Sequence, residues 1–158
     1  MSKTQKTPAG EALTDLILTL FRVNNLTLAW GDRLVAPFGL SSARWQVIGA
    51  IAFADRPQPV AWLARDLGAN RQNVQRIVND LHREELIRFE PNPHHRRAKL
   101  VILTEKGQQA FEAATSSWYP EADKLVEGLS EADIRTAHHV MMALRTKLEG
   151  EGDVEKQP

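Results

Sequence analysis

Cysteine is absent from this 158-residue chain, which excludes disulfides, thiolate metal ligands, cysteine nucleophiles and thiol-based redox switches. Long hydrophobic runs are absent too, and no stretch approaches the roughly eighteen consecutive apolar residues of a transmembrane helix. The opening segment MSKTQKTP contains no apolar stretch, so no secretory signal is expected. Together these absences predict a cytoplasmic protein without a membrane partner.

An excess of one charge is also missing, because the chain carries 20 basic and 20 acidic residues. The distribution along the chain is nevertheless uneven. Residues 65–103 hold eight basic and five acidic residues, whereas residues 104–158 hold six and eleven. This pattern indicates that an anionic partner would bind the middle of the chain. The length and the 42% hydrophobic content are those of one globular domain with a sizeable core.

Apolar residues at three- and four-residue steps predict two helices before the basic segment. The first pattern begins at Glu11 and is broken by Pro37 and Gly39. The second opens at Ser41–Ser42, whose hydroxyls suit a helix N-cap, and ends before Pro57. Residues 1–10, which precede the first pattern, are expected to form a disordered tail.

Two further helices are predicted after the basic segment. A long pattern follows Thr104, with a bend expected at Pro120, and Gly128 ends it. Ser130 and Asp133 have the spacing of a capping box at the start of the last helix. That helix carries an apolar stripe of Ile134, Ala137, Met141, Leu144 and Leu148, which resembles a short coiled-coil seam. Residues 150–158 are expected to be a second disordered tail.

The strongest motif lies in residues 60–77, where two amphipathic helices flank a tight turn at Gly68-Ala69-Asn70. Pro59 is expected in the first helical turn, Ala64 is the small residue where the helices cross, and Gly68 tolerates a positive φ. Asn70 suits the N-cap of the second helix. The buried side of these helices is expected to comprise Leu63, Leu67, Val74, Ile77, Val78 and Leu81. This spacing favours a DNA-binding helix-turn-helix over an ordinary helical hairpin.

The outward face of the second helix carries arginine and amide side chains at Arg71, Gln72, Gln75, Arg76 and Asn79. Arginine hydrogen-bonds guanine in the major groove, and glutamine or asparagine hydrogen-bonds adenine. A helix face that is merely solvated more often carries paired glutamate and lysine. The composition of this face therefore indicates contact with bases and phosphates of DNA.

After the second helix of this motif, the spacing of apolar residues changes to the alternation that is typical of strands. Residues 86–89 and 98–103 are predicted to pair, with a polar hairpin tip over residues 90–97 that contains Arg96 and Arg97. Such a hairpin can insert an arginine into the narrow minor groove, where the negative potential is enhanced. A surface hairpin with two solvated arginines is the alternative.

The order of these elements resembles a MarR-type winged helix-turn-helix transcriptional regulator over about residues 11–149. The junction Leu103–Gly107, with the sequence LTEKG, is the most specific part of this resemblance. The family's hairpin usually reads Asp-x-Arg; here His95 stands in place of the aspartate, and Arg97 is the matching arginine. A protonated His95 would add a third positive charge beside Arg96 and Arg97.

The resemblance implies a mainly α fold with an α+β wing. The winged helix-turn-helix would span residues 38–104, and the dimerisation helices would span residues 11–36 and 105–149. It further implies a sequence-specific repressor that binds double-stranded DNA as a homodimer, on a pseudo-palindromic operator. The apolar stripe of the last helix independently favours a dimer. The predicted DNA contacts are Ser42, Asn70, Arg71, Gln72, Asn73, Gln75, Arg76, Arg96 and Arg97.

A small aromatic or phenolic effector is implied by the resemblance alone. Trp30, Trp45 and Trp118 lie on helices expected to meet, with Arg44 close by, and such a site would suit a planar, anionic aromatic. The alternative is that these tryptophans belong to the core.

Two other functions stay open from the sequence. The five histidines would allow a metal-responsive regulator, although no metal site is predicted from their spacing. A helical interaction module that does not bind DNA is the second alternative, and salt-dependent binding to duplex DNA would distinguish it. No catalytic residues and no cofactor are expected, because the chain contains no nucleophile elbow, phosphate-binding glycine loop or metalloprotease motif.

Overall fold

The computed structural model describes residues 7–154 of the chain. These residues form six α-helices, one 3-10 helix and three strands, which confirms the predicted mainly helical fold with a small sheet. One compact unit runs up to Trp118, and a second begins at Tyr119. In chain order the elements are α1 (Pro8–Val35), η1 (Ala36–Phe38), α2 (Ser42–Ala52), β1 (Gln58–Pro59), α3 (Val60–Asp66), α4 (Arg71–Arg83), β2 (Ile87–Glu90), β3 (Leu100–Leu103), α5 (Glu105–Leu125) and α6 (Glu131–Val154).

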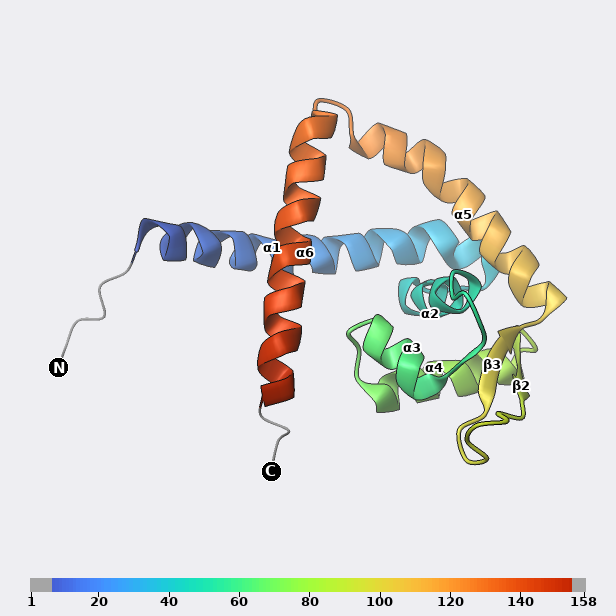
Figure 1. The fold of residues 1–158 in the computed structure, drawn as a ribbon. Helices are drawn as coiled ribbons and strands as arrows, with labels where there is room; N and C mark the ends of the chain where they lie inside the picture. The colour runs from blue at the N-terminus through green and yellow to red at the C-terminus, as the bar shows by residue number, and fades with distance from the viewer. Residues whose placement is uncertain (1–6, 155–158) are drawn as a thin grey trace. The chain divides into compact units, whose positions relative to one another are not determined.

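The core of the first unit lies where α2, α3 and α4 gather beside the hairpin of β2 and β3 (Figure 1). Ile48 of α2, Leu63 of α3, Val78 of α4 and Val101 of β3 are all essentially inaccessible to solvent. Burying a side chain of this size stabilises the folded state by about 1.5–3 kcal/mol. These contacts fix the orientation of α4, the helix whose outer face is of functional interest.

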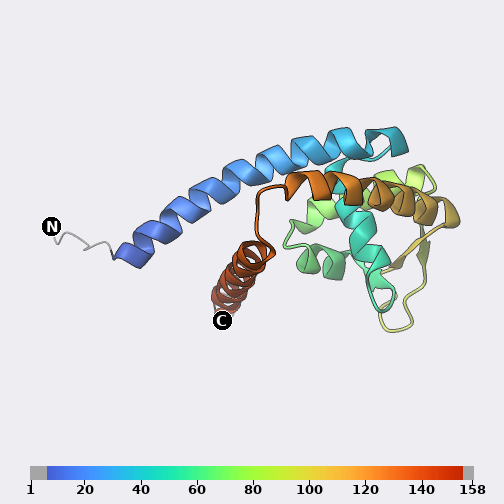
Figure 2. The same ribbon diagram turned by 90° about the horizontal axis from the view of Figure 1, so that it is seen from above.

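The first helix begins at Pro8, three residues before the predicted start at Glu11. The side chain of Thr7 accepts a hydrogen bond from the amide of Gly10 at 3.1 Å, and Pro8 occupies the first turn, where its missing N–H is no loss. The expected tail is therefore wrong for residues 8–10, and residues 1–6 lie outside the described part. Figure 2 shows α1 as one continuous helix.

Ser42 joins α2 to the end of α1. It is buried; its amide donates a hydrogen bond to Asp32 Oδ1 at 2.7 Å, and its hydroxyl donates to the Leu28 carbonyl at 2.7 Å. Gly31 makes this approach feasible, because a Cβ there would lie 2.4 Å from Ser42 Oγ. The prediction that Ser42 contacts DNA is thus wrong: both of its donors hold α1 against α2. The N-cap of α2 is Ser41, whose side chain accepts from the Arg44 amide.

The sheet contains one strand more than the sequence predicts. Gln58 pairs with Val101 and Pro59 with Leu100, which places β3 between β1 and β2. Pro59 is therefore in an extended conformation immediately before α3, and not in its first turn. A proline is tolerated there because it lies in a short edge strand. Strands β2 and β3 begin one and two residues later than predicted.

The junction between β3 and α5 accounts for the LTEKG sequence. The Thr104 hydroxyl donates a hydrogen bond to the Glu85 carbonyl at 2.6 Å and accepts one from the Gly107 amide at 3.0 Å. At Gly107 a Cβ would lie 1.9 Å from the Leu86 carbonyl oxygen, so only glycine fits. Helix α5 is thereby held tightly against the turn that follows α4.

The C-terminal helices follow the predicted order with a longer last helix. Helix α5 continues through Pro120, and Gly128 adopts a φ of 81° in the turn that follows. The amide of Asp133 donates to the Ser130 hydroxyl at 3.0 Å, as the capping-box spacing predicts. Helix α6 extends to Val154, so the expected tail is wrong for residues 150–154; residues 155–158 lie outside the described part. Within residues 7–154 no helix is long and apolar enough to cross a bilayer.

Candidate nucleic-acid interface

Helices α3 and α4 form the predicted helix-turn-helix. Ala64 is buried between them, and Gly68 adopts a φ of 61°, a left-handed conformation in which glycine is favoured. The Asn70 side-chain oxygen accepts hydrogen bonds from the amides of Gln72 and Asn73, at 2.8 and 3.3 Å. This cap fixes the residue at which α4 begins and, with it, the direction of every side chain on the helix.

The rotational phase of α4 agrees with the predicted one. Its buried row consists of Val74, Ile77, Val78 and Leu81. At 100° per residue, Gln72, Arg76 and Asn79 project away from that row, and all three are exposed. Arg71 and Asn73 are also exposed, whereas Gln75 is half-buried. The outer face of α4 is free of carboxylates through Asn79.

Two hydrogen bonds join side chains along this face. The Arg76 guanidinium donates to Asn73 Oδ1 at 2.9 Å, and the Gln75 amide donates to Asn79 Oδ1 at 3.0 Å. Exposed pairs three or four residues apart stabilise a helix by only about 0.2–0.5 kcal/mol. They are therefore readily exchanged for hydrogen bonds to base edges, for which arginine and amide groups are suited.

Asn92 shapes the loop between β2 and β3, which we call the wing tip (residues 91–99). Its amide nitrogen donates to the Ala98 carbonyl at 3.0 Å, and its amide oxygen accepts from the His94 backbone at 3.0 Å. Arg96 and Arg97 are exposed, and within residues 7–154 neither has a hydrogen bond or ion pair. Sequence reasoning missed Asn92, although its position between two prolines is a turn signal.

A hollow joins the start of α4 to the wing, and we call it the basic hollow. It is lined by Pro59, Val60, Ala61, Arg71, Gln75, Phe89, Arg97, Ala98 and Lys99. Three cations from two separate elements, Arg71, Arg97 and Lys99, therefore surround one concave surface. The Lys99 ammonium lies 5.9 Å from the centre of the Phe89 ring. Such a set suits a phosphate oxygen better than a base edge. Lys99 was missed from sequence, although it stands two residues after Arg97 and directly before β3.

The three tryptophans expected to form an effector site do meet. The Trp118 ring lies 5.2 Å from Trp30 and 5.9 Å from Trp45, measured between ring centroids. Arg44 is committed elsewhere: its guanidinium donates to the Gly39 carbonyl at 3.0 Å and forms an ion pair with Glu84. Aromatic contact among the tryptophans is thus built into the first unit, with the arginine tied to the end of α4.

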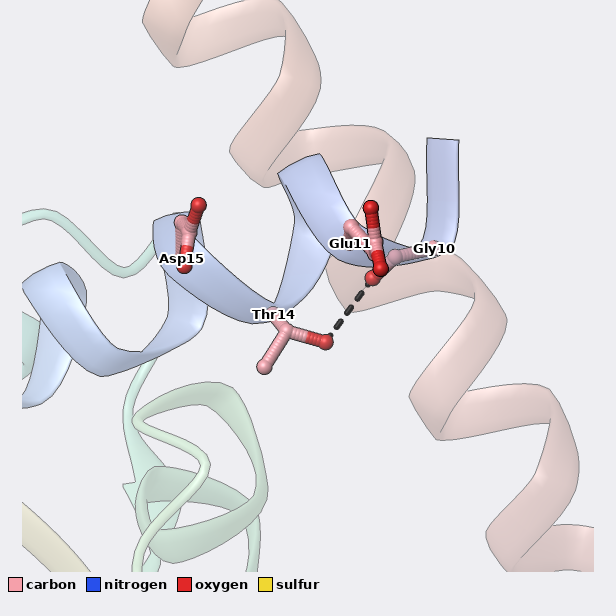
Figure 3. A pocket seen from close by; sticks show the side chains of 4 residues that line it. All are labelled: Gly10, Glu11, Thr14 and Asp15. Atoms are coloured by element: carbon pink, nitrogen blue, oxygen red, sulfur yellow. Dashed lines mark hydrogen bonds between the residues drawn. The ribbon is translucent and has the colours of Figure 1, made fainter. Parts of the chain in front are cut away.

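A second hollow lies at the start of α1, far along the chain from the helix-turn-helix. Its described lining consists of Gly10, Glu11, Thr14 and Asp15, and the Thr14 hydroxyl donates to the Gly10 carbonyl at 2.8 Å (Figure 3). Two carboxylates repel phosphate, so this hollow is no candidate for DNA contact. Among residues 7–154, no group of three histidine, aspartate or glutamate side chains is placed to hold a metal ion.

Comparison with known proteins identifies similar chains. Residues 38–98 match the family model described as the MarR family. An uncharacterised protein of Mycobacterium tuberculosis is 29% identical over 142 residues, which cover 90% of this chain and 98% of the relative. The transcriptional activatory protein BadR of Rhodopseudomonas palustris is 30% identical over 107 residues, or 65% of this chain and 59% of BadR.

Solved structures give the same picture of the fold. The crystal structure of CouR from Rhodococcus jostii, bound to p-coumaroyl-CoA, superimposes with a TM-score of 0.73 at 19% identity. The superposition covers 82% of this chain and 91% of CouR. At this identity the comparison establishes a common fold.

Proposed function

This chain belongs to the MarR family of transcriptional regulators, and from that premise we propose that it binds a pseudo-palindromic DNA operator as a homodimer. The observation that carries the proposal is the exposed, carboxylate-free face of α4 beside a wing with two unpaired arginines. Gln72, Arg76 and Asn79 would contact base edges in the major groove. Arg71, Arg97 and Lys99 of the basic hollow would contact the phosphate backbone between helix and wing.

Exposed apolar side chains support the homodimer. On α1, Phe21 is 62% exposed and Leu26 is 70% exposed, and on α6 Leu148 is 64% exposed. Large apolar side chains repeated along a helix and left in water mark a surface that a partner covers. A second copy of the chain would place two α4 helices on one face of the duplex, about one helical turn apart.

Repression is the regulatory direction we propose, because a dimer on an operator that overlaps a promoter excludes polymerase from it. The compartment is then the one that holds the chromosome, the cytoplasm. The relative BadR is a transcriptional activatory protein, and a reporter assay distinguishes repression from activation for this chain. A reporter driven by the bound promoter should rise when the gene for this chain is deleted. A fall in the reporter would instead identify an activator.

An aromatic effector is proposed at the cluster of Trp30, Trp45 and Trp118. Indole rings at these separations offer a surface for a planar ring, and Arg44 could offer its charge by exchanging Glu84 for an anion. Titration with p-coumarate and with p-coumaroyl-CoA, followed by tryptophan fluorescence and DNA release, tests the proposal. Quenching that disappears in Trp118→Leu and coincides with release would support it; quenching without release would show binding that does not regulate.

Selection of genomic fragments by the purified protein tests the DNA proposal. We expect enrichment of one inverted-repeat motif, with half-sites about ten base pairs apart and two protein chains per site. Arg97→Ala should weaken binding to that motif and reduce the log–log salt slope by about one unit for each protomer, or about two units for the dimer. Uniform recovery of unrelated fragments, with no shared motif, would contradict the proposal.

A further inference from the structure

An exposed tryptophan on α3 contacts two arginines that belong neither to the outer face of α4 nor to the basic hollow. The Cζ atoms of Arg56 and Arg65 lie 5.5 and 5.6 Å from the centre of the Trp62 ring, and the indole is 40% exposed. These distances are those of cation–π contacts. A guanidinium that lies over an aromatic ring keeps its N–H edge free for an anion while losing conformational freedom. We call these residues the Arg56–Trp62–Arg65 cluster.

Two exposed carboxylates, Asp55 and Asp66, adjoin the two arginines in the sequence and balance their formal charge, but neither holds its arginine firmly. Arg65 forms an ion pair with Asp66 at 3.3 Å, and both side chains are largely exposed, so the pair is weak and easily exchanged. Asp55 precedes Arg56 in the sequence and is exposed. In the part of the chain that the structure describes, Arg56 has no hydrogen bond or ion pair. The Arg56 guanidinium is therefore available to an anion, and that of Arg65 becomes available when its ion pair with Asp66 is exchanged.

The cluster continues the basic hollow along α3. Val60 and Ala61, in the first turn of α3, line that hollow together with Arg71 and Arg97. Arg65 follows Ala61 by four residues, so both lie on the same side of the helix. In helix-turn-helix proteins the first helix crosses the DNA backbone while the second enters the major groove. DNA that extends beyond the operator would therefore run along the side of α3 that carries Arg65.

We propose that the Arg56–Trp62–Arg65 cluster binds the phosphate backbone of duplex DNA that flanks the operator. The inference rests on the proposed DNA-binding function and adds a contact outside the bases that α4 reads. A phosphate backbone suits the cluster because fixed cations are sufficient to bind it. An acidic protein surface is less suited, because protein interfaces also bury a packed apolar centre, and the cluster offers a single indole.

Two duplexes with the same operator test this inference. The short duplex ends at the edge of the selected motif, and the long duplex adds about ten base pairs, one helical turn, on each side. We expect the wild-type protein to bind the long duplex more tightly and with a steeper salt dependence. The double variant Arg56→Ala/Arg65→Ala should lose this gain. Its log–log salt slope on the long duplex should be about two units smaller for each cluster that contacts the DNA. On the short duplex it should bind like the wild type.

Matched variants separate the cluster from general loss of charge or of fold. Arg135→Ala on α6 removes an exposed arginine of the other unit and should change binding to neither duplex. Arg56→Gln alters a loop residue and leaves Trp62 in place, so it should keep the fold and lose part of the gain. Thermal melting of each variant should match the wild type.

Three results would overturn the inference, and a fourth would overturn the proposed function on which it rests. Wild-type affinity of the double variant for the long duplex would show that the cluster does not contact DNA, and would leave an acidic protein as its partner. Equal weakening on both duplexes would place the cluster within the operator contacts themselves. Failure of the wild-type protein to prefer the operator over a scrambled sequence would overturn the proposed function, whereas tight and length-independent binding would overturn the flanking contact alone.

Discussion

At the scale of single residues, the side chains expected to read DNA differ from those that hold the fold. Gln72 and Arg76 are exposed on α4, and their only described side-chain hydrogen bond, from Arg76 to Asn73, is local. Gly107 lies against the Leu86 carbonyl, where no side chain fits. Substitutions at these two kinds of position should therefore change different quantities: DNA affinity in one case, the free energy of unfolding in the other.

Replacing Gln72 or Arg76 by alanine should weaken binding to the operator without lowering the melting temperature. Each loses a base contact in both half-sites, and each contact is worth about 1–3 kcal/mol, which is roughly a five- to 150-fold loss of affinity per half-site. Binding to non-specific DNA should fall much less for Gln72→Ala, which removes no charge. Gln108→Ala, an exposed glutamine on α5, is the control and should bind as the wild type does. A large drop in melting temperature with unchanged specificity would show that these side chains do not face the DNA.

Gly107→Ala should destabilise the protein strongly, because the new Cβ would lie 1.9 Å from a backbone oxygen that cannot rotate away. Overpacking of this kind typically costs about 1–3 kcal/mol and sometimes more. Gly150→Ala is the matched control: it lies in α6 with nothing within 4 Å of the new Cβ and should be neutral or stabilising by up to about 1 kcal/mol. Urea unfolding of both variants measures the difference, and equal midpoints would contradict the close approach at Gly107.

At the scale of elements, the sequence predicts α4 well and the loops around it less well. The helical phase follows from Val74 and Ile77 alone, because burial of an apolar row fixes where the remaining side chains point. Strand β1 escapes prediction because two residues, one of them a proline, carry no strand period of their own. Ser42 is a false DNA contact because a serine at a helix start also suits a phosphate; only tertiary packing against α1 reveals its buried partners.

The charges of the site are predictable from the sequence, whereas the contacts that support them are not. Arg97 is recognisable from a hairpin tip rich in arginine, whereas Asn92 acts through hydrogen bonds across the wing tip that depend on the closed loop. The cation–π contacts of Trp62 likewise join residues from a loop and a helix. Such contacts have no periodic signature, since they arise only after the chain has folded.

Asn92→Ala should therefore loosen the wing tip and weaken DNA binding while the melting temperature stays nearly constant. The variant loses two exposed or half-buried hydrogen bonds, each worth about 0.5–1.5 kcal/mol, in a loop outside the core. If Asn92 acts by placing Arg97, the double variant Asn92→Ala/Arg97→Ala should bind no more weakly than Arg97→Ala alone. Additive losses, measured by fluorescence anisotropy on one operator, would show that the two residues act independently.

At the scale of the whole molecule, the apolar surface of the terminal helices exceeds what one chain covers. Phe21 and Leu26 on α1, and Ile134 and Leu148 on α6, are exposed in the single chain. A monomer would leave this surface in water, whereas a dimer would bury it at the interface between the two chains. The same interface would set the spacing of the two α4 helices.

Replacing Met141 and Leu144 by aspartate should abolish the dimer. Both positions belong to the apolar stripe of α6, and an unpaired carboxylate buried in an interface is strongly unfavourable. Sedimentation velocity should show a monomer, and operator binding should fall with it. Glu131→Asp/Glu149→Asp, which keeps the charge of α6, serves as the control. A double aspartate variant that stays dimeric would place the interface elsewhere.

The central claim, that the outer face of α4 and the wing read a specific duplex, is tested most directly by one titration series. The wild-type protein is titrated into its selected operator, and into a scrambled duplex of the same length and composition, at several salt concentrations. We predict a preference for the operator of about 10³-fold or more, which survives at every salt concentration although both affinities fall as salt rises. Equal affinity for the two duplexes, or binding that does not depend on salt, would contradict this claim.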